Sequence, residues 1–189
     1  MLEAALIFIR KKLDQHFVNY FGLNESATVL NHLIDPDGSV PQKNQNKMVI
    51  TLINLEHETA KQFYGGQKNV GGDSSGKVYP AIHFNLDILF TASFDDYEES
   101  LKFLGETIAF FQANQSFNSR NMPDIPTGIT MLNFEIESAS YFETHNLWSA
   151  MGAKFQPSII YKVRHIGIQS DEVRVKYQKI GDVQSGVNP

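Results

Sequence analysis

Residues 71–77 are the part of the chain whose residue types and spacing come nearest to a chemical site. They read GGDSSGK, which satisfies the G-x-x-x-x-G-K spacing of a phosphate-binding loop. Such a loop also needs a Ser or Thr after the lysine to hold magnesium, and a helix whose N-terminus points at the phosphates. Here Val78 follows Lys77 and a strand is expected next. We therefore predict a flexible loop and no nucleotide site.

Two other segments contain residue types that bind metal ions. Asp35 to Gly38 begins like a calcium loop, but Asn46 stands at the twelfth position, where a glutamate is required. Glu56-His57-Glu58 could ligate a metal, yet no second histidine lies one helical turn away. The remaining histidines are scattered along the chain without a recognisable catalytic triad. These patterns predict a protein that is not an enzyme and that has no metal or cofactor.

Length and composition limit the remaining possibilities. A chain of 189 residues suits one domain with a sizeable core. The net charge of −5 argues against nucleic-acid binding, and no apolar run approaches the roughly 20 residues of a membrane span. The absence of cysteine suits a reducing cytoplasm, and the N-terminal charges follow the apolar residues, the reverse of a secretory signal. We expect a soluble protein that is not inserted into a membrane.

The elements that must position any site are clearest between residues 78 and 117. Alternating apolar residues predict a strand from Ile82 to Phe90, and the period then changes to that of a helix that begins near Asp95, capped by Ser93 or Asp95. The apolar residues at helical spacing, expected to face the core, are Tyr97, Leu101, Leu104, Ile108 and Phe111. A strand that leads directly into such a helix predicts a sheet with helices packed on it.

The rest of the chain predicts further helices and strands of the same kind. A helix is expected over Leu2–Phe21, and a short one from Ser138 or Ser140 through Trp148. Further strands are expected at Ala27–Ile34, Lys47–Leu55, Ile129–Glu137 and Ser158–Ile168, and a mobile loop at 57–77. In Ser158–Ile168, strict alternation places Ile160, Lys162, Arg164 and Ile166 on one face. The predicted fold class is α+β: one domain over 1–168, with a mixed β-sheet flanked by helices, and a C-terminal extended arm over 169–189.

Three features indicate surfaces for protein–protein contact: two adjacent aromatic residues, an uneven distribution of charge, and a strand near the C-terminus. Phe110 and Phe111 are adjacent on a helix and point about 100° apart, so one of them could meet a partner, the alternative being a second contact inside the domain. Acids dominate residues 87–106 and bases dominate 154–179, an asymmetry that could steer identical copies together or merely mark solvated faces. The candidate interface residues are Phe110, Phe111, Lys162, Arg164, Arg174, Lys176 and Tyr177.

The alternating run at 173–178 predicts a strand near the C-terminus. It could complete the sheet of a partner, with Arg174 and Lys176 attracting acidic residues. The alternative is an edge strand of the protein's own sheet.

Two stretches resemble the cap, or tail-terminator, proteins of phage-tail-like contractile injection systems. They are Pro80–Phe117 (PAIHFNLDILFTASFDDYEESLKFLGETIAFFQANQSF) and His145–Ile168 (HNLWSAMGAKFQPSIIYKVRHIGI), and the helix at the N-terminus resembles the family's opening. The matching residues are Tyr97, Leu101, Phe110, Phe111, Gln112, Leu147, Trp148, Gly152, Pro157, Tyr161 and Arg164. The resemblance covers about residues 1 to 168.

The resemblance implies a structural role without catalytic residues. It implies a homo-hexameric ring that ends the inner tube and the sheath and so fixes the length of the particle. The partners are then other copies of this chain, the sheath protein and the inner tube protein. Assembly in the cytoplasm is expected, on a particle that is either released or membrane-anchored. An alternative from another class is a small α+β ligand-binding protein or enzyme with its site near the loop at 57–77.

Overall fold

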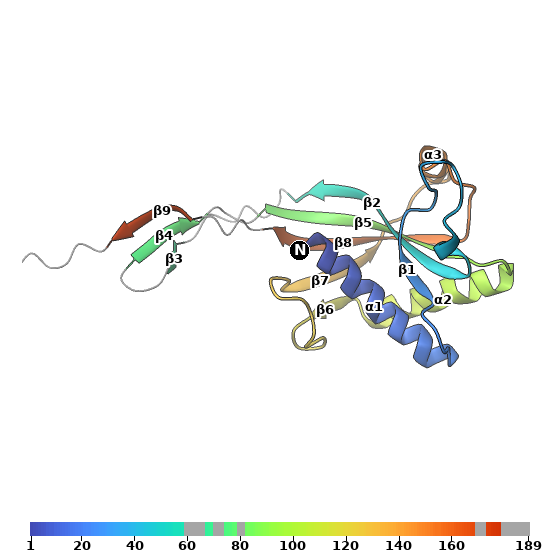
Figure 1. Cartoon of the computed structure of the whole chain (residues 1–189), viewed down its shortest axis with the longest axis horizontal. Coiled ribbons are helices and arrows are strands. Elements are labelled where there is room, and N and C mark those ends of the chain that lie inside the picture. The colour runs from blue at the N-terminus through green and yellow to red at the C-terminus, as the bar shows by residue number, and fades with distance from the viewer. Residues whose placement is uncertain (59–66, 70–73, 79–81, 169–172, 179–189) are drawn as a thin grey trace, which may run out of the picture.

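The chain folds around a six-stranded mixed sheet with helices on both faces, as the computed structural model shows (Figure 1). The structure describes residues 1–58, 67–69, 74–78, 82–168 and 173–178. The strand order is β1-β2-β5-β8-β7-β6. The strands are β1 (Thr28–Leu30), β2 (Lys47–His57), β5 (Ile82–Ser93), β6 (Ser116–Asn118), β7 (Met131–Ile136) and β8 (Ser158–Ile168). The predicted α+β class, a single domain with a mixed sheet and flanking helices, is confirmed.

Helices α1 (Leu2–Phe21) and α2 (Tyr97–Ala113) cover one face of the sheet and enclose the main core. The bounds of α1 are those predicted, and Gly22 ends the helix in the left-handed conformation, with φ of 65°. From α1 the core receives Phe8, Ile9, Leu13 and Phe17. From the strands it receives Leu86, Ile88, Phe90, Leu132, Phe134, Tyr161 and Val163. None of the described helices is long and apolar enough to cross a bilayer.

Helix α2 buries a different face from the one that the sequence predicts. Its buried residues are Ser100, Phe103, Thr107, Phe110 and Phe111, whereas Tyr97, Leu101 and Ile108 are exposed. The helix is apolar around more than one face, and the phenylalanine rings, which have the larger apolar area to bury, take the core side. Thr107 is accommodated there because its hydroxyl donates to the carbonyl oxygen of Phe103 at 2.8 Å.

The start of α2 also differs from the prediction by one residue. Neither Ser93 nor Asp95 caps the helix; the side chain of Asp96 accepts a hydrogen bond from the backbone N–H of Glu99. Asp95 instead accepts hydrogen bonds from the side chains of Gln45 and Asn46. Asp96 therefore caps the helix at the end of the connection from β5 to α2. Asp95 links that connection to the loop before β2, which contains Gln45 and Asn46.

Helix α3 (Tyr141–Ala150) lies on the opposite face of the sheet over a smaller second core. Ser140 and Glu143 form a reciprocal capping box, so the second of the two predicted starting serines is correct. Gly152 follows the helix with φ of 66°. Trp148 is the buried residue of this helix, and it packs with Leu33, Val49 and Leu89.

Irregular pairing changes which residues of β8 share a face. The register between β5 and β8 shifts between Phe84 and Leu86, which is the signature of a β-bulge. Lys162 and Arg164 remain on one face, but Ile166 joins Tyr161 and Val163 in the main core. The expectation that Ile166 lies beside Lys162 and Arg164 was therefore wrong, because strict alternation holds only in a regular strand.

A second, three-stranded sheet contains β3 (Gln67–Asn69), β4 (Ser74–Val78) and β9 (Val173–Gln178), in the order β3-β4-β9. It lies apart from the six-stranded sheet in Figure 1. The described part of 57–77 thus contains two strands, where a loop was predicted. The predicted strand near the C-terminus is present and pairs antiparallel with β4 of the same chain, with Ser75 opposite Tyr177. This pairing corresponds to the own-sheet alternative.

Candidate interaction surfaces

Phe110 and Phe111 do not form a surface. Their exposed fractions are 7% and 1%, and their ring centroids lie 5.1 Å apart. Phe111 contacts Phe134 and Tyr161 at centroid distances of 4.6 and 4.8 Å, while Phe110 lies 4.9 Å from His16. Each ring meets a different part of the same core, so the alternative of a second contact inside the domain applies, and neither residue is available to a partner.

Lys162 and Arg164 lie in a network that we call the charged face. It covers the part of the sheet beside α3 and consists of Glu56, Glu58, Asp87, Glu135, Glu137, Lys162 and Arg164. Nζ of Lys162 lies 3.0 Å from Glu56, 3.5 Å from Glu137 and 3.8 Å from Asp87.

The second cation of the charged face completes the network. Nε of Arg164 donates to Glu135 at 2.8 Å, and one of its terminal nitrogens lies 3.9 Å from Glu58. The alternation of β2, β5, β7 and β8 brings these side chains to one face, because cross-strand partners point the same way.

The charged face is acidic overall, contrary to the basic surface expected from residues 154–179. Five carboxylates surround two cations. Burial raises the pKa of Asp87, against the opposing effects of the hydrogen bond from Asn54 and the charge of Lys162. The hydrogen bond to Glu56 raises the pKa of Lys162. Lys162 and Arg164 are thus paired within the chain, and Asp87 is the cross-strand partner of Lys162.

Arg174, Lys176 and Tyr177 lie on β9, away from Lys162 and Arg164 in the topology, and their side chains lie outside the described part of the structure. Their role as interface residues remains a prediction. In the GGDSSGK segment, Gly71 to Asp73 lie outside the described residues, and Lys77 is in strand β4. Among the described residues, no group of three or more His, Asp or Glu side chains could hold a metal ion.

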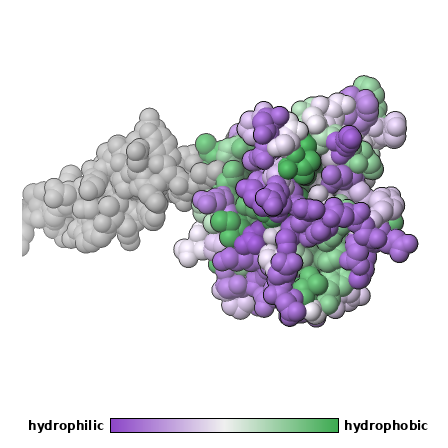
Figure 2. All heavy atoms as spheres, turned by 45° about the vertical axis from the view of Figure 1, so that its right-hand side comes forward, coloured by the Kyte–Doolittle hydropathy of each residue, from purple (hydrophilic) through white to green (hydrophobic). Residues whose placement is uncertain are grey.

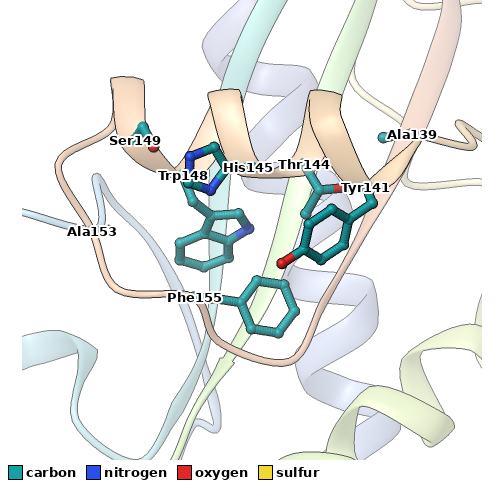
Figure 3. A pocket seen from close by; sticks show the side chains of 8 residues that line it. All are labelled: Ala139, Tyr141, Thr144, His145, Trp148, Ser149, Ala153 and Phe155. Atoms are coloured by element: carbon teal, nitrogen blue, oxygen red, sulfur yellow. The ribbon is translucent and has the colours of Figure 1, made fainter.

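A groove of about 740 Å³ lies beside α3. We call it the α3 groove; its lining residues are Ala139, Tyr141, Thr144, His145, Trp148, Ser149, Ala153 and Phe155. Figure 3 shows the rings of Tyr141 and Trp148 extending from the helix towards Phe155, which comes from the segment after it. Tyr141 is 91% exposed and Phe155 is 68% exposed, and the Phe155 ring lies 5.4 Å from Trp148 in an edge-to-face arrangement. Sequence reasoning singled out Trp148 but neither Tyr141 nor Phe155, although two adjacent aromatic residues, Tyr141 and Phe142, begin the helix.

A second apolar surface is present because α2 exposes apolar residues that were predicted to face the core. Tyr97, Leu101 and Ile108, with exposed fractions of 66%, 47% and 36%, recur at helical spacing on the side of α2 that faces away from the core. We call them the α2 stripe. Gly105 lies on the same side, and a Cβ placed on it would meet no atom within 4 Å. Figure 2 shows, for one side of the domain, that apolar residues are exposed among hydrophilic ones.

The described part of the chain is thus an α+β domain with a charged face, an apolar groove and an exposed apolar stripe. The chain belongs to the family of the Pvc16 N-terminal domain, whose family model matches residues 8–180. A search of the curated proteins finds no match.

Two solved structures share the fold. One is the tube-terminating cap of the anti-feeding prophage, at a TM-score of 0.62 and 13% identity, with 97% of this chain and 62% of that chain covered. The other is the sheath/tube terminator, in its extended state, of PVC, an extracellular contractile injection system. Its TM-score is 0.59 at 15% identity, with 97% of this chain and 63% of that chain covered. This chain thus spans less than two thirds of the length of either protein.

Proposed function

We propose that this chain is a structural cap, or terminator, of a phage-tail-like contractile injection system. The observation that carries the proposal is the agreement between family membership over residues 8–180 and the fold match over 97% of the chain to two tube-terminating proteins. The acidic, internally paired charged face and the exposed apolar surfaces suit a protein that is recognised by other proteins rather than one that turns over a substrate.

The partners of the chain in this role are other copies of itself, the inner tube and the sheath. Copies of the chain form a hexameric ring at the end of the particle, where the ring contacts the inner tube and the sheath and stops further addition to both. The ring assembles in the cytoplasm and stays on the finished particle. The role is not catalytic, which agrees with the failure of every chemical motif in the sequence.

Particle length is the measurement that tests this role. Particles assembled without this chain should have tubes and sheaths of widely varying length in electron micrographs, because nothing then stops polymerisation. Supplying the wild-type chain in trans should restore one narrow length class. Particles of unchanged, uniform length in the absence of the chain would show that length is fixed elsewhere.

A further inference from the structure

We infer that the α2 stripe of one copy docks into the α3 groove of the next copy, so that the contact between subunits is heterologous. The inference rests on the proposed function for the presence of neighbouring copies, and it goes further by naming the two surfaces that meet. It follows from the shapes, positions and charges of the two surfaces.

The α2 stripe is an apolar surface that stays partly exposed within the described part of the chain. A core position would bury Leu101 and Ile108, yet the structure leaves them exposed while Phe103 and Phe110 fill the core. A glycine inside a helix costs about 1 kcal/mol relative to alanine. Among the described residues, none lies close enough to Gly105 to exclude a side chain at that position. A second protein surface, in contrast, could approach the helix backbone closely there.

The α3 groove offers a complementary shape. Its aromatic walls, Tyr141 and Phe155, are largely exposed, while Trp148 forms a buried base. A groove of about 740 Å³ has room for projecting side chains of the size of Tyr97 and Leu101. Exposed aromatic side chains around a concave apolar surface are characteristic of interface centres rather than of freely solvated faces.

The charges beside the two surfaces are also complementary. Glu98 lies in the first turn of α2 beside Tyr97, whereas the neighbouring Glu99 is paired with Lys102 of the same helix at 3.3 Å. The exposed Lys154 directly precedes Phe155 at the edge of the α3 groove. Docking of the stripe in the groove would bring opposite charges to the rim, where they favour the correct orientation more than they add affinity.

The two surfaces lie on opposite faces of one sheet, which sets the kind of assembly. Helix α2 covers one face and α3 the other (Figure 1). A self-complementary patch produces a closed dimer, whereas two different patches that face away from each other produce a chain of subunits that closes into a ring when the rotation permits. The arrangement therefore fits a ring of identical subunits.

The contact is tested by mixing two variants, each of which has one of the two surfaces disabled. Leu101→Asp disables the stripe and keeps the groove, and Phe155→Asp disables the groove and keeps the stripe. Each variant alone should lose at least tenfold in self-association by light scattering. An equimolar mixture should form a dimer and nothing larger, because one intact stripe then meets one intact groove. Val40→Asp, at an exposed loop position outside both surfaces, should assemble like the wild type, and circular dichroism should show all three folded.

Cross-linking gives a second measurement that does not depend on strong association. The chain contains no cysteine, so Leu101→Cys and Phe155→Cys each carry a single thiol. The mixed pair should form a disulfide faster than either variant with itself. A wild-type chain that is monomeric at every concentration without a mixed disulfide, or faster pairing of Leu101→Cys with itself, would overturn the inference. Failure of the proposed function would be visible separately, as particle length that does not depend on the chain.

Discussion

Asp87 lies in the charged face, and its burial opposes its negative charge. It is 7% exposed, opposite Lys162 on the neighbouring strand, and accepts a hydrogen bond from the side chain of Asn54 at 3.0 Å. These partners favour the carboxylate, but burial outweighs them and the pKa of Asp87 is raised. The free energy of unfolding is therefore larger when Asp87 is protonated than when it is charged.

This conflict predicts how stability changes with pH. Because the pKa of Asp87 is higher in the folded state, its favourable contribution is complete below the unfolded value of about 4 and is lost as pH rises through the folded value. Asp87→Asn keeps the shape and removes the titration. Relative to wild type, the variant should gain stability as pH rises from about 4, by about 1.4 kcal/mol for each unit by which the pKa is raised.

Urea unfolding at a series of pH values measures this difference. Glu3→Gln, which removes an exposed carboxylate on α1, serves as the control and should follow the wild-type curve. A constant difference between Asp87→Asn and wild type across this range would contradict the argument, because it would show that the carboxylate is equally charged in both states.

At the scale of elements, α3 is held to the sheet by few contacts. Trp148 is its buried residue, and the aromatic side chains at its start face solvent. Trp148→Ala should therefore weaken the attachment of the helix by about 3–5 kcal/mol, the usual cost of removing a large buried aromatic side chain. Because the main core lies on the opposite face of the sheet, α1 and α2 should stay in place.

Amide hydrogen exchange followed by mass spectrometry resolves this local effect. Exchange should accelerate in α3 and stay unchanged in α1 and α2. Tyr141→Ala is the matched control on the same helix, and as a change at a 91% exposed side chain it should alter stability by less than about 0.5 kcal/mol. Equal acceleration across all helices in Trp148→Ala would mean that the two cores unfold as one unit.

Element types were largely predictable from the sequence because periodicity and capping are local. The bounds of α1, the start of β5 at Ile82 and the serine cap of α3 follow from patterns within a few residues. The face of α2 was not predictable, since apolar residues occur on two sides of the helix and the choice depends on which side chains fill the core. The bulge in β8 depends on pairing with β5, which no local pattern contains.

The candidate surfaces were less predictable for the same physical reason. Phe110 and Phe111 carry the residue type of an interface, but only the packing of α1, α2 and the sheet shows that both rings are buried. Lys162 and Arg164 look like a basic patch along one strand, yet the acids that pair with them come from β5 and from the ends of β2 and β7. The exposed α2 stripe contains residues that the same periodicity had placed in the core.

At the scale of the whole molecule, the described C-terminal strand β9 belongs to a different sheet from the six strands of the main domain. Every strand of the main sheet lies between residues 28 and 168, and Ile166 is the last of the described residues in its two cores. Among the described strands, β9 pairs with β4 in the small sheet, where it is one of the two outer strands. An outer strand presents one row of backbone groups that a strand of a neighbouring protein could pair with.

Deletion of residues 170–189 separates folding from capping. The truncated chain should keep the helical circular dichroism signal of the wild type and a cooperative melt, because all three described helices and both cores remain complete. We expect it to lose the ability to end particles at a defined length if β9 and its basic residues, Arg174 and Lys176, join the ring to sheath or to a neighbouring subunit. Deletion of 181–189 alone keeps β9 and should leave length control intact, which makes it the matched control. Loss of the fold in the longer truncation would instead make the extension part of the domain itself, and normal particle length with the longer truncation would exclude it from capping.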